Sequence, residues 1–122
     1  MLMQLSHVIV FVSDMQRSIA FYRDALGFPV KMESPGWTEL HSGATTIALH
    51  PAKAEPRPPA TEPRAGEAQL GLQVLDIQKF YEEKKAKGVE FVMPPTLRDF
   101  GGKLAVFIDP DGMPISVTQE IR

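Results

Sequence analysis

The first apolar residues of the chain alternate with other residues, a pattern typical of a strand that is buried on one face. The stretch QLSHVIVFV predicts this strand at residues 4–12. The period then changes: apolar residues recur at steps of three and four, which predicts a helix over 15–26, capped by Asp14 and ended by Gly27. Three short strand-like runs follow, FPVKMES, WTELH and TTIALH, the last two separated by a turn-like SGA. Together they predict a β-α-β-β-β module.

The second half of the chain repeats this module. Residues 68–92 match residues 6–30 at an offset of 62 until one residue drops out near Gly88, and the strand-like runs EFVM, KLAVFI and PISVTQ follow. Between the halves, five prolines among balanced charges favour extended chain over sheet. We therefore predict a single domain, 1–122, with module one at 1–50, a proline-rich linker at 51–66 and module two at 67–122.

Composition narrows the class of protein. Cysteine is absent, which excludes disulfides and thiolate metal sites and suits a reducing cytoplasm. Thirteen basic and fifteen acidic residues give a net charge of −2 without a basic block, so we expect no nucleic-acid partner and no membrane surface. The longest apolar run, 8–12, is too short to span a bilayer, and no export signal is seen. We therefore expect a cytoplasmic protein.

Strand alternation assigns one face of each module to the helix and leaves the other face open. In module one Val8, Val10 and Val12 lie under the helix, so the open face carries a different set of side chains. Over both modules this set is His7, Ile9, Phe11, Trp37, Glu39, His41, Thr46, Ala48, His50, Gln69, Gly71, Gln73, Ser116, Thr118 and Glu120. A solvated polar face is one interpretation. Because tryptophan and phenylalanine suit solvent poorly, we favour a groove that binds a small molecule.

The stretches HVIVFVSDMQRSIAFYRDALGF and VFIDPDGMPISV resemble the vicinal oxygen chelate superfamily. This group includes glyoxalase I, fosfomycin-resistance enzymes, extradiol dioxygenases, methylmalonyl-CoA epimerases and bleomycin-resistance proteins. The resemblance covers the whole chain and implies an α+β fold in which two βαβββ modules form an open, cup-shaped barrel, with two chains paired as a homodimer. It also implies metal ligands at the places of His7, Ala48, Gln69 and Ser116.

Only His7 among these four is a typical metal ligand. Glyoxalase I chemistry also needs a carboxylate base near the metal, and Ala48 and Ser116 stand where such carboxylates lie in the family. We therefore expect metal-independent binding of a small organic molecule, as in drug-sequestering members of the family, with no cofactor. The expected ligand-binding residues are His7, Ile9, Phe11, Trp37, Ala48, His50, Gln69, Gln73 and Ser116.

One alternative is a lyase, isomerase or dioxygenase that depends on a divalent metal. His7 would then be joined by a relocated ligand, namely His50, Glu39 or Glu120. A shift of two residues along a strand moves a side chain by ~6.6 Å, which makes this set hard to assemble. The sequence names no catalytic residue and leaves open whether the protein is an enzyme. The acidic pair in DPDG, 109–112, is interpreted as turn chemistry.

Overall fold

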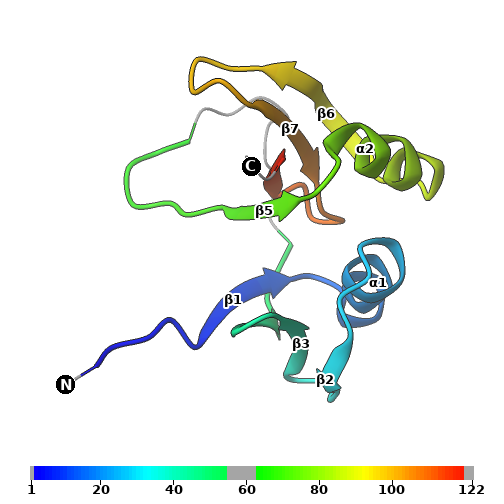
Figure 1. The fold of residues 1–122 in the computed structure, drawn as a ribbon. Coiled ribbons are helices and arrows are strands. Elements are labelled where there is room, and N and C mark those ends of the chain that lie inside the picture. Colours follow the sequence, from blue (N-terminus) through cyan, green and yellow to red (C-terminus); the bar gives the residue numbers. More distant parts are fainter. Residues whose placement is uncertain (1, 55–62, 120–122) are drawn as a thin grey trace. The chain divides into compact units, whose positions relative to one another are not determined.

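The computed structural model describes residues 2–54 and 63–119, and the chain divides into two compact units, Met1–Glu55 and Pro56–Arg122 (Figure 1). Each unit has the element order β-α-β-β-β. The predicted α+β fold of two βαβββ modules is therefore confirmed. The cup formed by two such sheets stays a prediction. Of the predicted linker, residues 55–62 lie outside the described residues.

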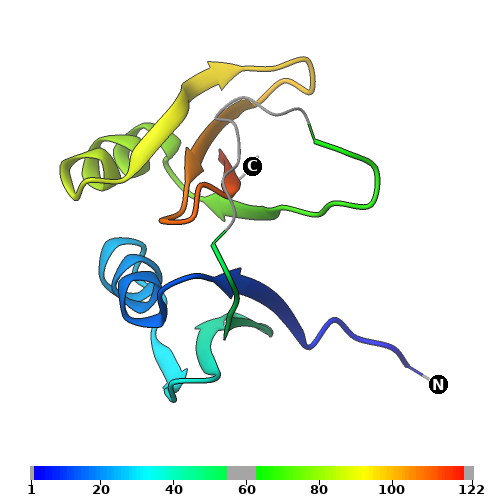
Figure 2. The same cartoon turned by 180° about the vertical axis from the view of Figure 1, so that it is seen from behind.

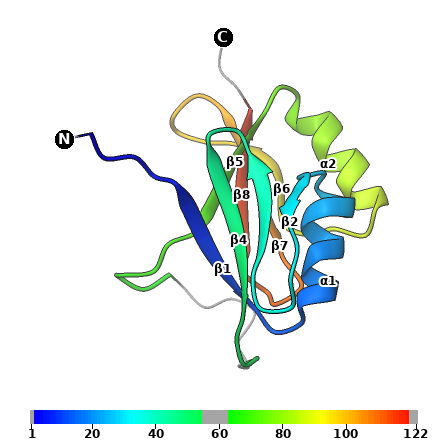
Figure 3. The ribbon, with the colours of Figure 1, turned by 90° about the horizontal axis from the view of Figure 1, so that it is seen from below.

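Unit one is a four-stranded mixed sheet with one helical segment. Its elements are β1 (His7–Val12), α1 (Met15–Ile19), the π-helix η1 (Ala20–Ala25), β2 (Val30–Met32), β3 (Thr38–Ser42) and β4 (Thr45–Pro51). The strand order is β1-β4-β3-β2, with β1 parallel to β4 and the other pairs antiparallel. Figure 3 shows β1, β4 and β3 side by side, with α1 along one side of the sheet.

Unit two repeats this topology. Its elements are β5 (Leu70–Val74), α2 (Ile77–Ala86), β6 (Glu90–Leu97), β7 (Lys103–Ile108) and β8 (Pro114–Gln119), in the sheet order β5-β8-β7-β6. Helix α2 packs against β6, β7 and β8 (Figures 1 and 2). Within the described parts of both units, no helix is long and apolar enough to cross a membrane.

The core of each unit lies between its helix and its sheet, where alternation predicted it. In β1, Val10 and Val12 are buried, whereas Ile9 and Phe11 on the other face are exposed. The buried apolar residues of unit one include Val10, Val12, Ile19, Tyr22, Leu40, Ile47 and Leu49, and those of unit two include Ile77, Val89, Ala105, Phe107, Ile115 and Val117. The predicted assignment of faces in β1 is therefore confirmed.

Several strand boundaries differ from the predicted ones. Of the predicted FPVKMES run only Val30–Met32 forms a strand, and β3 begins at Thr38, so that Trp37 lies just before it. The first strand begins at His7 rather than at residue 4, and correspondingly Gln69 lies just before β5. Strand β6 continues through Pro94 and Pro95, beyond the predicted EFVM run. Its register with β7 shifts in this region, because proline has no N–H to donate to a neighbouring strand and is tolerated only at bulges or edges.

The predicted uninterrupted helix over 15–26 is wrong in its second half, where η1 is a π-helix. The backbone hydrogen bonds show the cause. In unit two the N–H of Val89 donates to the carbonyl of Lys84 at 3.0 Å, whereas the matching bond in unit one runs from Phe28 to Tyr22, also at 3.0 Å, and encloses one residue more. A π-turn accommodates such an extra residue without moving the flanking segments onto another face.

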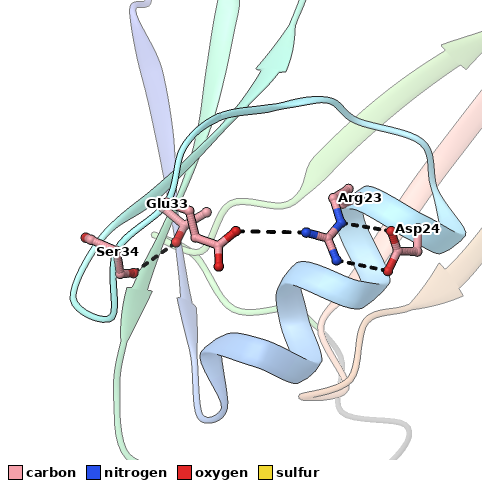
Figure 4. Close-up of polar contacts among 5 residues, drawn as sticks. Arg23, Asp24, Glu33 and Ser34 are labelled. Atoms are coloured by element: carbon pink, nitrogen blue, oxygen red, sulfur yellow. Dashed lines mark hydrogen bonds and ion pairs between the residues drawn. The ribbon is translucent and has the colours of Figure 1, made fainter.

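Figure 4 shows how η1 is joined to the chain beyond β2. The Arg23 guanidinium lies 2.8 Å from Asp24 and 3.9 Å from Glu33. The hydrogen bond to Asp24 raises the pKa of Arg23 above its ordinary value, and the charge of Glu33 adds a smaller effect in the same direction. These groups are well exposed, so the contacts orient the π-turn more than they stabilise the fold.

Candidate functional site

Strand pairing in unit one places the predicted site residues on one face of the sheet. Residues directly opposite on neighbouring strands share a face. The pairs of β1 and β4 on this face are His7 with Thr46, Ile9 with Ala48 and Phe11 with His50, and Glu39 of β3 pairs with Ala48 from the other side. The structure therefore brings these side chains of unit one together as the alternation predicted.

Four rings form a connected row on this face, which we term the aromatic cluster: His7, Trp37, His50 and Phe11. The ring centroids are 6.1 Å apart for His7 and Trp37, 6.2 Å for Trp37 and His50, and 5.7 Å for His50 and Phe11. All three pairs meet edge to face, an arrangement in which the positive edge of one ring lies near the negative face of the next. The cluster is thus a continuous aromatic surface.

Trp37 is held in one orientation by its neighbours. Its indole Nε1–H donates to Glu39 Oε2 at 2.7 Å, and Lys31 Nζ lies 3.9 Å from the other oxygen of the same carboxylate. The hydroxyl of Ser34 donates to the Trp37 carbonyl at 2.6 Å and accepts from the Trp37 N–H at 3.1 Å. Both the backbone and the side chain of Trp37 are therefore fixed before any ligand arrives.

Ala48 lies on the same face of the sheet as the aromatic cluster. Its neighbours along β4 on this face are Thr46, the partner of His7, and His50. The indole of Trp37 is about equally far from the rings of His7 and His50, and Ala48 is fully buried although it lies on the face away from the helix. The assignment of Ala48 as a ligand contact stays a prediction.

One hydrogen bond of His50 decides which tautomer the ring adopts when it is neutral. His50 Nδ1 lies 2.8 Å from the carbonyl oxygen of Pro51. A carbonyl oxygen only accepts hydrogen bonds, so Nδ1 carries the hydrogen and Nε2 presents a lone pair. His7 differs, because its Nδ1 lies 2.7 Å from the Ser6 hydroxyl, which can donate or accept.

The predicted site residues of unit two form a polar strip without aromatic rings. Gln73 is exposed, Ser116 is partly buried, and Gln69 lies just ahead of β5. Gly71 pairs with Ser116, and a Cβ added at Gly71 would lie 3.4 Å from the Ser116 hydroxyl, so the glycine leaves that hydroxyl uncovered on its side. The assignment of Gln69, Gln73 and Ser116 as ligand contacts stays a prediction.

Comparison with known proteins identifies the family. The sequence profile of the Glyoxalase/Bleomycin resistance protein/Dioxygenase superfamily matches residues 4–117. The chain belongs to this superfamily. Its resemblance to the vicinal oxygen chelate proteins is thereby confirmed.

Two relatives and one solved structure illustrate the range of this superfamily. The chain is 30% identical over 122 residues to virulence protein STM3117 of Salmonella typhimurium, covering 97% of this chain and 85% of that protein. It is 26% identical over 113 residues to a bleomycin resistance protein of Klebsiella pneumoniae, covering 87% and 84% respectively. The crystal structure of SMU.1112c superposes with a TM-score of 0.81 at 27% identity, over 97% of this chain and 99% of that one.

The donors at the superfamily's metal positions do not fit a divalent metal. His7 supplies an imidazole, but Ala48 supplies no donor and the hydroxyl of Ser116 is a weak neutral one. The fourth place, Gln69, offers an amide oxygen at best. These four positions therefore do not supply the ligand set that a divalent metal needs.

The relocated metal set is not assembled in the described residues either. Among residues 2–54 and 63–119, no three His, Cys, Asp or Glu side chains lie close enough to hold an ion. The Trp37 indole lies next to both His7 and His50, and the Glu39 carboxylate contacts Trp37 and Lys31. Glu120, the remaining candidate, lies outside the described residues.

Sequence reasoning missed the residues that support Trp37. The sequence predicts Glu39 on the open face and suggests it only as a metal ligand, and it gives no signal for Ser34 or Lys31. A signal for Glu39 existed, because residues two apart on a strand share a face and can contact each other. The roles of Ser34 and Lys31 depend on the course of the chain between β2 and β3, which no short-range pattern predicts.

Proposed function

We propose that this member of the superfamily binds a small organic molecule on the aromatic cluster, without a metal. The observation that carries the proposal is the exposed aromatic surface of unit one. Phe11 is 62% exposed, and Ile9, which lies two residues before it on the same face of β1, is 41% exposed. Large apolar side chains gathered on one open face are typical of an interaction site.

The rigid mounting of Trp37 supports the same proposal. A side chain that is already ordered loses little conformational freedom on binding, which leaves more of the contact energy for affinity. The bonds to Glu39 and Ser34 provide this order in the free protein. Tryptophan also offers a large flat surface for stacking, and it is enriched at sites that dominate binding energy.

The proposal is tested by replacing Trp37 with alanine. Bleomycin is the first probe, because one relative carries that drug in its name, and planar aromatic molecules follow. Loss of a central aromatic contact is expected to weaken binding by at least about tenfold. Amide resonances of β1 and β4 in the ¹⁵N-labelled protein measure both the affinity and the integrity of the fold.

The matched control for this experiment is Phe100→Ala. Phe100 is 56% exposed and belongs to the turn between β6 and β7 in unit two, whereas the aromatic cluster is built from residues of unit one. Its removal should leave the affinity unchanged. An unchanged affinity in Trp37→Ala, with the amide spectrum intact, would contradict the proposed site.

We propose further that two copies of the chain form a dimer. Leu2 and Met3 are each 92% exposed and Leu5 is 69% exposed, all directly before β1. Strand β1 lies at the edge of its sheet and pairs only with β4 within the described residues. Apolar side chains beside an open edge favour association with another chain.

We propose also that the protein works in the cytoplasm. The absence of cysteine agrees with a reducing compartment.

A further inference from the structure

We propose that the aromatic cluster selects planar molecules that carry a hydrogen-bond donor at the edge of the ring, and that His50 Nε2 accepts this hydrogen bond. This inference rests on the proposed function and adds the chemical class of the ligand. It assigns to His50 the role of the residue that determines specificity.

The first step is the fixed polarity of His50. Its Nδ1 hydrogen is used by the carbonyl of Pro51 at 2.8 Å, so a neutral His50 can only accept at Nε2. No residue in the described part of the chain donates a hydrogen bond to that nitrogen. The imidazole therefore brings an unused acceptor into a row of rings.

The second step is that the other strong acceptor of the face is already engaged. The Glu39 carboxylate accepts from the indole of Trp37 at 2.7 Å and lies 3.9 Å from Lys31. His7 imposes no polarity, since the Ser6 hydroxyl beside it can donate or accept. His50 is thus the group of the cluster whose hydrogen-bonding direction is set by the fold.

The third step concerns the shape of the ligand. The ring of His50 meets Phe11 at 69° and Trp37 at 79°, so the imidazole stands nearly perpendicular to both neighbours. The Nε2 lone pair lies in the plane of the imidazole. A flat molecule that stacks on Phe11 or Trp37 lies beside the His50 ring, and a donor on such a molecule reaches Nε2 only along the plane of the imidazole. A ligand with such a donor gains a hydrogen bond to Nε2, whereas a ligand without one covers this nitrogen and leaves it unpaired.

Indole and 1-methylindole provide matched probes, because methylation removes the only hydrogen-bond donor and keeps the ring. The Nε1–H resonance of Trp37 is the readout in the ¹⁵N-labelled full chain, since this is the only tryptophan. We compare the affinity ratio of indole to 1-methylindole in the native protein and in variants. His50→Phe keeps a ring without an acceptor, and His50→Gln keeps an acceptor without a ring.

The affinity ratio of indole to 1-methylindole should fall about fivefold in His50→Phe, which is the size expected for one hydrogen bond. In His50→Gln the ratio should fall less, because the side chain keeps an acceptor. His41→Phe is the control, because His41 is exposed on the same face of β3 and pairs with Thr46 rather than with a ring of the cluster. It should leave the ratio unchanged.

Two other results would overturn the inference in different ways. If both probes bind and the ratio is the same in His50→Phe as in the native protein, the donor requirement is wrong while the proposed binding site stands. If neither probe shifts the Trp37 resonance at millimolar concentration, the inferred ligand class is wrong, and the proposed binding site is then decided by the bleomycin titration of the native protein and of Trp37→Ala.

Discussion

At the level of single residues, position 48 shows how a small side chain shapes the open face. Ala48 lies on β4 between Thr46 and His50 and is fully buried. A carboxylate in this place would be removed from water at a high cost unless it found a partner. The alanine therefore leaves the face without a charge at this position.

Asp109 shows the opposite case, an acidic residue in a chemically suggestive position with a structural role. The residue is 3% exposed, and its Oδ1 accepts from the backbone N–H groups of Asp111 and Met113, each at 2.9 Å. Gly112 in the same turn has a φ of 83°, which glycine adopts without strain. The interpretation of DPDG as turn chemistry is confirmed.

We expect Asp109→Ala to lower the free energy of unfolding by about 2 kcal/mol, because two backbone donors lose their partner in a largely buried turn. Asp109→Asn retains an oxygen acceptor and should cost less than half as much. Urea denaturation followed by circular dichroism measures both. Equal losses in the two variants would show that the negative charge, and not the accepted hydrogen bonds, matters at this position.

At the level of elements, the two helices show how a repeat tolerates a change in length. Both begin after an aspartate whose carboxylate accepts from the N–H three residues on, Asp14 from Arg17 and Asp76 from Lys79, each at 3.0 Å. Unit one has one residue more before its closing glycine. The π-turn confines this residue to the exposed end, so that Tyr22 remains fully buried.

Deleting Asp24 should therefore be tolerated. The deletion removes one residue from the π-turn and an exposed contact with Arg23, and we expect the free energy of unfolding to change by no more than about 1 kcal/mol. Amide hydrogen bonding in the variant should match that of α2, which hydrogen exchange can measure.

The control deletion is Glu82 in the middle of α2. Removing one residue from a regular helix rotates everything beyond it by about 100°, which turns its buried side away from the sheet. We expect this variant to lose several kcal/mol. A loss of similar size on deletion of Asp24 would show that the π-turn is required for the packing of unit one.

At the level of the whole molecule, the two units share a topology and differ in the chemistry of their open faces. Unit one carries four rings, whereas the matching strands of unit two carry Gln73, Ser116 and Thr118. Duplication supplies two similar scaffolds, and side chains that do not support the core are free to diverge. The proposed recognition of aromatic molecules therefore belongs to unit one.

Pairing of two copies is also a property of the whole molecule. Sedimentation equilibrium should give about 27 kDa, twice the 13.5 kDa of one chain. Leu5→Glu should shift the equilibrium toward the monomer, because a charge next to the edge of β1 opposes association. Phe100→Glu is the control, since Phe100 is also well exposed, at 56%, but belongs to the turn between β6 and β7 and not to the edge of a sheet. A monomer mass for the native chain would contradict the proposed homodimer.

The sequence by itself determined which residues share a face. Alternation in a strand has a period of two that depends on local backbone geometry alone, so His7, Ile9 and Phe11 could be separated from Val10 and Val12 without any tertiary information. Helix caps and the DPDG turn were predictable for the same reason, because their hydrogen bonds join residues that are close in the sequence.

Tertiary structure alone decided how the face is built. The contacts of Trp37 with His7 and His50 join three separate segments, and its orientation depends on Glu39 and on the loop held by Ser34. Side-chain torsions of this kind follow from packing between strands, which no local period encodes. The π-turn is similar: the sequence shows an extra residue, but only the packing of Tyr22 against the core decides where that residue is accommodated.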